Sequence, residues 1–196
     1  TFIFGEKYIS MEEVNKHGIY AHATAQEMGL RSGYKILQVN GKALDDFSDT
    51  RKVLLESNSS FLVQRGSEQL TVKVPVNLLD KLSDKEKGFI DPLMPFKVGE
   101  VKPDMNAKKA GLQQGDSIVS VNGSKISYFQ DVQEALKANK NKTIALGVKR
   151  NDSISVLAVK VDSSGIIGFA PEINMETSVR EYTFMASIGR GTYKSF

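Results

Sequence analysis

The chain contains two histidines, His17 and His22, and no cysteine, which excludes a thiolate metal site. A helical zinc site of the His-Glu-x-x-His kind needs two imidazoles one helical turn apart and a glutamate that activates water. The two histidines here are five residues apart, with Gly18 between them and no glutamate in the frame. We therefore interpret both as loop histidines, either satisfied or exposed.

Serine chemistry and charge patterns give no better support for catalysis. No Gly-x-Ser-x-Gly turn occurs, and no serine is paired with a base by its sequence position. The acid pairs Glu12-Glu13 and Asp45-Asp46 are typical of helix N-termini, where negative charge offsets the helix dipole. The net charge is +3, and the lysines within 108–109 and 137–142 fit solvated helix faces better than a nucleic-acid surface. We expect a chain that is not itself an enzyme and has no metal, cofactor or nucleic-acid site.

A repeated block organises the sequence. Residues 29–41 and 111–123 both read Gly-Leu-x-x-Gly, then a short apolar stretch, then Asn-Gly, in the same order and without a gap. The register holds beyond the block, since Phe47 matches Phe129. At 196 residues the chain is long enough for two small domains, each with a modest core. The sequence therefore predicts two copies of one fold.

The second copy predicts a clear order of elements. Asn106 caps a short helix over residues 107–110, and Gly111 ends it. Gly115 leads into a strand that the Asn-Gly pair closes with a tight turn, and a longer helix follows at 129–138. A last strand follows Arg150. The apolar strand positions are Ile118, Val119 and Val121, and then Ile154, Val156 and Ala158.

The first copy predicts the corresponding elements. Thr24 or Ala25 opens its short helix, Gly29 ends it, and the longer helix is expected at 46–56. Its apolar strand positions are Ile36, Leu37 and Val39, and then, after Arg65, Leu70, Val72 and Val74.

This order of elements resembles the PDZ domain, over residues 18–92 and 96–174. PDZ domains of the usual order begin with a Gly-Leu-Gly-Phe-like loop. Here Gly165-Ile166-Ile167-Gly168-Phe169 follows the last strand, and Gly88-Phe89-Ile90 has the comparable place in the first copy. That order resembles the circularly permuted PDZ of bacterial envelope proteases. The resemblance implies an α+β, mainly β fold of two circularly permuted PDZ domains, each a small, partly open β-barrel or sandwich with two helices.

The ends of the chain resemble one group of these proteases. Residues 2–8 and 182–188 are similar to the stretches that flank the tandem PDZ region of RseP-type site-2 proteases, the zinc metalloproteases of regulated intramembrane proteolysis, in Bacteroidetes-like members. The chain begins at Thr1 without an initiator Met, and no apolar run approaches the roughly 20 residues of a membrane helix. We therefore expect a piece of a longer protein.

The resemblance has several implications for that longer protein. Its zinc would be held by residues outside this chain, and this chain would be a periplasmic region of an inner-membrane protein. The substrates would be membrane proteins of the anti-sigma-factor or signal-peptide-remnant type, as in the sigma-E stress response.

Three segments outside the two domains have expected roles. Residues 1–17 would be an arm that follows a membrane helix, and 76–88 would be a linker helix, because Leu78, Leu79 and Leu82 lie at helical spacing. Residues 175–196 would be amphipathic, with apolar residues at three- and four-residue spacing that contact the membrane surface. These membrane-contact candidates are Tyr182, Met185, Ile188, Tyr193 and Phe196.

By resemblance, each domain would hold an extended peptide between one strand and the long helix. Pro92 and Pro171 follow the groove glycines closely and offer no amide to a partner strand, so an added peptide would be short. The first groove is less regular, since Tyr34 replaces the family aspartate that Asp116 keeps. The implied groove residues are Ile167, Gly168, Phe169, Ala170, Phe129, Gln133 and Leu136 in the second copy, and Gly88, Phe89, Ile90, Phe47, Arg51 and Leu54 in the first.

Three functional hypotheses remain open from the sequence. The first is a size filter, in which two rigid lobes exclude substrates with bulky periplasmic domains from the membrane active site. The second is a sensor that binds a peptide C-terminus and activates the protease. The third is a free-standing PDZ scaffold or secretion-system adaptor without a protease.

Overall fold

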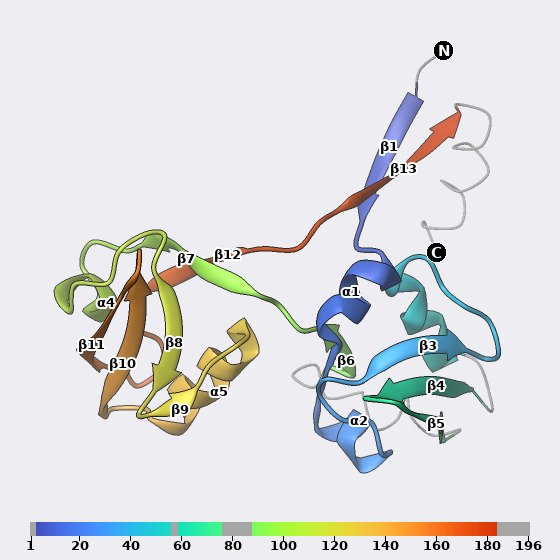
Figure 1. The fold of residues 1–196 in the computed structure, drawn as a ribbon, viewed down its shortest axis with the longest axis horizontal. Coiled ribbons are helices and arrows are strands. Elements are labelled where there is room, and N and C mark those ends of the chain that lie inside the picture. Colours follow the sequence, from blue (N-terminus) through green and yellow to red (C-terminus); the bar gives the residue numbers. More distant parts are fainter. Residues whose placement is uncertain (1–2, 56–58, 76–87, 184–196) are drawn as a thin grey trace. The chain divides into compact units, whose positions relative to one another are not determined.

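The computed structural model describes residues 3–55, 59–75 and 88–183. The chain divides into two compact units, one made of Thr1–Pro92 with Glu176–Phe196 and the other of Leu93–Met175 (Figure 1). Both are α+β and mainly β, as the sequence predicts, and the described strands form small open sheets without a closed barrel. The expected linker helix lies outside the described residues, apart from Gly88. None of the helices in these ranges is long and apolar enough to cross a bilayer.

The first unit contains two small antiparallel sheets and a terminal ribbon. Strand β3 pairs with β4, which continues through a hairpin into β5, while β2 pairs with β6 and β1 with β13. Its elements are β1 (Ile3–Tyr8), α1 (Met11–His17), β2 (Ile19–Ala21), α2 (Ala23–Glu27), β3 (Lys35–Val39), the 3₁₀ helix η1 (Phe47–Leu55), β4 (Ser60–Arg65), β5 (Glu68–Lys73), β6 (Ile90–Pro92) and β13 (Ser178–Thr183).

Helix α1 belongs to the core of the first unit. Ser10 begins it, because its hydroxyl accepts a 3.1 Å hydrogen bond from the Glu13 amide. Gly18 ends it at φ +91°, and a Cβ there would lie 2.7 Å from the Gly33 carbonyl oxygen, so only glycine fits. Met11 and Val14 are buried. Part of the segment expected to be an N-terminal arm thus packs within the unit.

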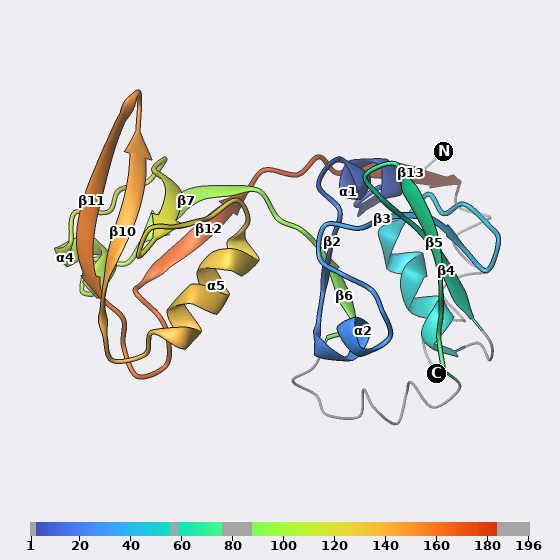
Figure 2. The same cartoon turned by 60° about the horizontal axis from the view of Figure 1, so that its bottom comes forward.

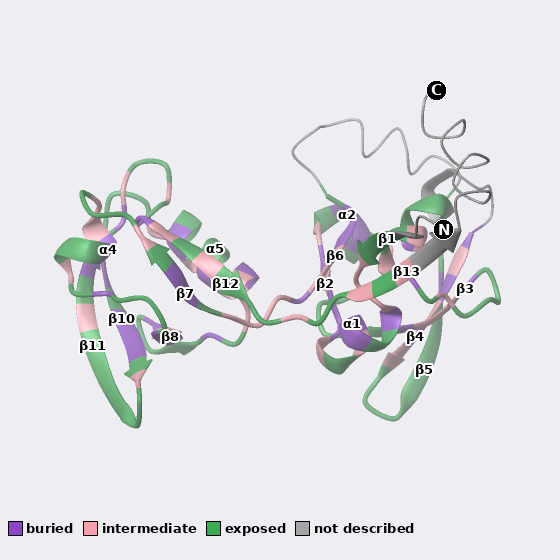
Figure 3. Cartoon of the chain, turned by 90° about the horizontal axis from the view of Figure 1, so that it is seen from above, coloured by how far each residue is buried: buried purple, intermediate pink, exposed green. Residues whose placement is uncertain are grey.

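The second unit has one four-stranded sheet and one pair of strands. The sheet has the order β11-β10-β8-β9, and β12 pairs with β7, all antiparallel. Buried residues lie on β7, β8, β10 and α5, which together enclose the core (Figure 3). Its elements are β7 (Phe96–Val101), α4 (Asn106–Lys109), β8 (Ser117–Val121), β9 (Ser124–Lys125), α5 (Phe129–Ala138), β10 (Thr143–Arg150), β11 (Ser153–Lys160) and β12 (Phe169–Ile173).

The repeated block folds alike in both units. Gly29 and Gly111 take φ values of +99° and +91° just after the short helices, as expected for helix-ending glycines. The two Asn-Gly pairs have positive φ at both residues, +50° and +74° at Asn40-Gly41 and +49° and +82° at Asn122-Gly123. The tight turns are therefore confirmed, and so is the long helix at 129–138.

Two local predictions are wrong. Asn106 does not cap α4, because its amide donates to the Lys160 carbonyl oxygen at 2.8 Å and Met105 is the N-cap residue. The counterpart of α5 in the first unit is a 3₁₀ helix rather than the expected α-helix over 46–56. The predicted last strand is confirmed as β11, in which Ile154 and Val156 are each 69% exposed while Val159 is buried. A strand has two faces, and alternation alone does not say which one meets the core.

Strands β1 and β13 form a ribbon that joins the two ends of the described chain. Their register runs from Ile3 opposite Thr183 to Tyr8 opposite Ser178. At the base of the ribbon, the Tyr8 hydroxyl and the Arg180 guanidinium each donate to Asp45 Oδ2 at 2.8 Å. Arg180 also lies 4.5 Å above the centroid of the Tyr8 ring.

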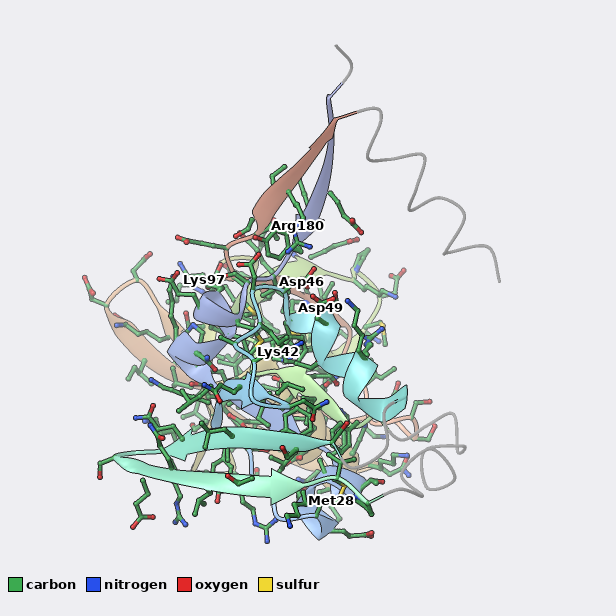
Figure 4. All side chains as sticks on the ribbon, turned by 90° about the vertical axis from the view of Figure 1, so that its right-hand side faces the viewer. Met28, Lys42, Asp46, Asp49, Lys97 and Arg180 are labelled. Carbon is green, nitrogen blue, oxygen red and sulfur yellow. The ribbon has the colours of Figure 1, made fainter. Side chains whose placement is uncertain are left out.

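This cluster fixes the ribbon to the rest of the first unit. Arg180 and Asp46 lie together at the base of the ribbon, with Nη1 3.7 Å from Asp46 Oδ2 (Figure 4). The hydrogen bonds from Tyr8 and Arg180 hold the pKa of Asp45 below its ordinary value.

The ribbon corrects one expectation about the C-terminal segment. Residues Ser178–Thr183 are a strand, so the helical spacing expected from residue 179 onward does not apply up to Thr183. Val179, Tyr182 and Thr183 favour extended structure, and β1 supplies the partner from the other end of the chain. Tyr182 lies on this strand, while Met185, Ile188, Tyr193 and Phe196 lie outside the described residues.

Candidate peptide-binding grooves

Helix α5 lies beside β12 in the second unit (Figure 2), so the two elements expected to bound the peptide groove are neighbours. The chain before β7 holds the start of the helix, because Phe129 N donates to the Met94 carbonyl at 2.9 Å and Gln130 Oε1 accepts from the Met94 amide at 3.1 Å. Asp131 Oδ2 accepts from the Tyr128 amide at 2.9 Å and closes the first turn. The helix is therefore fixed at the end nearest the aromatic residues.

Three phenylalanines meet between the two walls. Phe129 from α5, Phe169 from β12 and Phe96 from β7 have ring centroids 5.5 to 6.3 Å apart. The Phe129 ring is nearly perpendicular to that of Phe169, at 88°, and such edge-to-face pairs are favourable. All three are half-buried. They form an apolar floor that packs internally and still presents surface.

The loop before β12 provides free backbone donors. Asp162 organises it, since its Oδ1 accepts from the amides of Ser164 (2.9 Å) and Ile166 (2.8 Å). Gly168 has φ +99°, and a Cβ there would collide with the Met105 side chain, so the position requires glycine. Within the described residues the amides of Ile167 and Gly168 donate no hydrogen bond. Both residues are buried, so a carboxylate would reach these unpaired amides only after a local movement of the loop or of Met105.

The structure places the expected residues of the second groove in two groups. Leu136 and Ile167 are 6% and 1% exposed and belong to the core. Gln133 and Ala170 are exposed and can be reached by a ligand. The ladder between β12 and β7 is irregular between Phe169 and Pro171.

The first groove is more closed. Phe89 and Ile90 are buried, and the Phe89 ring lies 5.9 Å from the core residue Phe61. Phe47 is half-buried and Arg51 is exposed at the start of η1, while the Leu54 side chain lies outside the described part. Strand β6 is only three residues long and ends at Pro92. The first groove therefore offers a shorter backbone edge than the second.

His22 lies at the first groove, a position that the sequence did not predict. His22 Nε2 lies 2.6 Å from Asp91 Oδ2, and its ring meets the edge of Tyr20 at 4.8 Å. A Cβ on Gly88 would lie 2.7 Å from this nitrogen, so the glycine allows the ring to approach. His22 is thus a satisfied histidine, as interpreted. No group of three metal-ligand side chains occurs anywhere within residues 3–55, 59–75 and 88–183.

The sequence also missed an ion pair in the second unit. Asp116 is 1% exposed, and its carboxylate accepts from Arg150 Nε at 2.7 Å, Arg150 Nη2 at 2.8 Å and the Gln113 amide at 2.9 Å. Burial alone would raise the pKa of Asp116, but the hydrogen bonds from Arg150 and Gln113 and the charge of Arg150 outweigh it, so the pKa is lowered. The pair ties β10 to the turn before β8.

The fold and the sequence define the class of the second unit. Residues 97–150 match the PDZ domain family. The four-stranded sheet, the two helices and the late Gly-Phe strand agree with that match, so the second unit is a PDZ domain.

Comparison with curated proteins defines the wider group. The chain is 32% identical over 154 residues to a protein of Borreliella burgdorferi named as a zinc metalloprotease, covering 76% of this chain and 34% of that protein. It is 34% identical over 76 residues to the regulator of sigma-W protease RasP of Bacillus subtilis, covering 36% of this chain and 18% of that protein. The chain is 26% identical over 161 residues to a periplasmic serine endoprotease DegP-like protein of Chlamydia pneumoniae, covering 69% of this chain and 33% of that protein. The chain is thus similar to regions of bacterial proteases, among them a protein named as a zinc metalloprotease, and it spans about a third of the length of that protein.

Proposed function

We propose that this chain is the tandem PDZ region of a membrane zinc metalloprotease of the site-2 type and that it acts as a size filter for substrates. The relative named as a zinc metalloprotease and the one named as the regulator of sigma-W protease RasP support the parent enzyme. Its substrates would be membrane proteins of the anti-sigma-factor or signal-peptide-remnant type, met on the periplasmic side. The described residues contribute no zinc ligands to this proposal, so the metal would be held elsewhere in the parent protein.

The observation that carries the proposal is the ribbon of β1 and β13. Ile3 and Thr183 are register partners, so the chain enters and leaves the first unit at neighbouring points. A region of this kind can be inserted between two consecutive membrane segments. The grooves fit a passive role, since β6 is short and both groove strands contain proline.

The experiment removes both units at the base of the ribbon. Tyr8 lies opposite Ser178, so Asn-Gly can replace residues 9–177 of the parent protein and close the ribbon as a hairpin. We expect this variant to cleave a substrate that keeps its bulky periplasmic domain, which the intact protein spares. Both proteins should cleave the same substrate after that domain is trimmed. Loss of cleavage of the trimmed substrate in the variant would reject the filter and favour an activating role.

A second candidate function rests on the free amides of Ile167 and Gly168. They fit a sensor that captures a peptide C-terminus, with Phe129 and Phe169 beside the last side chain. A titration of this chain with peptides ending in an apolar residue tests it, with the same peptides amidated at the C-terminus as controls. We expect carboxylate-dependent binding no tighter than tens of micromolar, because a short ladder leaves little free energy beyond the cost of association.

The matched variant for the sensor is Phe129→Ala. This side chain is half-buried, whereas the core residue Leu136 cannot be changed without disturbing the fold. Submicromolar binding that Phe129→Ala abolishes would favour the sensor over the filter. The third hypothesis, a free-standing scaffold or secretion-system adaptor, would gain support if no protease sequence flanked this chain in its gene.

A further inference from the structure

Two arginines lie at corresponding places in the two units. Arg150 is the last residue of β10 and Arg65 is the last residue of β4, and each precedes a two-residue hairpin turn. Each arginine also has the same place relative to the neighbouring strand, since β10 pairs with β8 as β4 pairs with β3. One difference in their surroundings concerns the residue that faces the guanidinium.

That residue is Tyr34, which has the backbone position of Asp116. The Tyr34 carbonyl accepts from the Ile19 amide at 2.9 Å, and the Asp116 carbonyl accepts from the Val98 amide at 2.8 Å. In the second unit the Asp116 carboxylate accepts two hydrogen bonds from the Arg150 guanidinium. In the first unit the corresponding side chain has no charge.

The exchange leaves two hydrogen-bond donors free in the first unit. In the second unit Asp116 accepts from both the guanidinium of Arg150 and the backbone amide of Gln113. The corresponding donors in the first unit are the guanidinium of Arg65 and the amide of Arg31. Within the described residues neither donates a hydrogen bond, and Arg65 forms no ion pair, even with Glu68 across the hairpin.

These donors line a surface pocket of about 490 Å³. Arg31, Arg65, Ser32 and Tyr34 line it together with three glycines, and no acidic side chain takes part. The Arg31 guanidinium is held in place by the carbonyl oxygens of Gln26 (2.5 Å) and Leu30 (2.8 Å). The pocket thus combines one oriented and one unpaired guanidinium with a hydroxyl.

We propose that this pocket binds the carboxylate of an acidic side chain from a partner peptide, in the role that Asp116 has in the second unit. The internal pair supplies the reason for choosing a carboxylate, because Arg150 binds Asp116 through two nitrogens, the fork geometry that suits carboxylates. The site lies apart from the residues of the first groove, so it goes beyond the proposed function. It would add a charge-based contact to any partner of the first unit.

The test is an NMR titration of the 196-residue chain that follows the Nε–Hε signals of its arginines. The probe is tri-aspartate, N-acetylated and C-terminally amidated, with the corresponding tri-serine peptide and inorganic phosphate as comparisons. We expect tri-aspartate to shift the Arg65 signal with a Kd on the order of 1 mM, as befits an exposed charged contact. Tri-serine should leave it unchanged, and phosphate should shift it less than tri-aspartate does.

Three variants decide the assignment. Arg65→Gln should weaken tri-aspartate binding about tenfold, the effect of losing one charged hydrogen-bond partner, whereas Lys73→Gln, at the other end of the same hairpin, should leave the affinity unchanged. Tyr34→Asp should fill the site from within and abolish the shift at Arg65. If Arg65→Gln and Lys73→Gln weakened the affinity for tri-aspartate equally, the binding would depend only on the overall positive charge of the chain, and the proposal would be overturned. A stronger response to phosphate, or no shift at Arg65, would also overturn it.

Discussion

The ion pair of Asp116 and Arg150 allows a quantitative prediction about the second unit. Asp116 is almost fully buried, whereas the Arg150 side chain is 39% exposed. Arg150→Gln therefore leaves a buried carboxylate with one remaining amide donor, and breaking a buried pair in this way costs up to about 3 kcal/mol. Asp116→Asn instead leaves an arginine that water can reach, and we expect a loss of about 1.5 kcal/mol. The prediction is the order of the two effects.

The pH dependence of these variants follows from the same contacts. In the intact chain the folded-state pKa of Asp116 is lowered, so the stabilisation is present above the unfolded pKa and is lost as the pH falls through the folded value. In Arg150→Gln the burial would dominate and raise this pKa. That variant should then lose stability as the pH rises above the unfolded value. The stability difference between the intact chain and Arg150→Gln should therefore shrink as the pH falls below about 4.

The assay is urea unfolding followed by NMR, with amides of β10 reporting on the second unit and amides of β4 on the first. The chain has no tryptophan, so residue-level signals are needed to separate the units. Changes confined to β10 are expected for both variants. If Asp116→Asn proved as damaging as Arg150→Gln, or if the difference stayed constant with pH, the argument from unequal burial would be refuted.

Three other predictions concern glycine, the ribbon and low pH. Gly168→Ala should destabilise the second unit by at least about 2 kcal/mol in thermal unfolding, because the new Cβ would collide with Met105 and the φ is unfavourable for alanine. The control Gly115→Ala, where a Cβ meets no other atom, should cost about 1 kcal/mol from φ alone. Equal losses in the two variants would contradict the collision. Arg180→Ala should speed amide hydrogen exchange in β1 by about tenfold or more, while the control Lys7→Ala should leave it unchanged. Unchanged exchange rates in Arg180→Ala would show that the contacts of Arg180 with Tyr8 and Asp45 do not hold the ribbon. The protection factors of the β1 amides, which correct for the intrinsic slowing of exchange in acid, should also fall as the pH drops below about 4, because Asp45 has a lowered pKa and its contacts are lost on protonation. Protection factors that stay constant with pH would speak against this contribution.

Local chemistry explains which elements could be predicted. Asn40-Gly41 and Asn122-Gly123 determine their turns within two residues, and the helix at 129–138 has its core positions and its capping acid in its own sequence. The missed features depend on distant partners. Asn106 lies in the first turn, after the N-cap residue Met105, and its side-chain amide donates to Lys160, far along the chain.

The same limit applies to the candidate sites. The glycine-rich loop before β12 carries its own signature, so the free amides could be expected from the sequence. The roles of Arg65 and Arg150 depend on whether residue 34 or residue 116 beneath them carries a charge, and only the paired strands show that these residues meet. The ribbon joins the first and last described strands, a separation at which pattern carries no information about pairing.

The register of the ribbon also has a mechanical consequence. Ile3 and Thr183 lie at the same free end, so a force that separates the segments beyond them acts on one pair of residues at a time, from that end toward Tyr8 and Ser178. Hydrogen bonds loaded one after another yield at a lower force than bonds loaded together. Lateral movement of whatever flanks this chain would therefore open the ribbon progressively, and both folded units would be spared until the contacts at Asp45 give way.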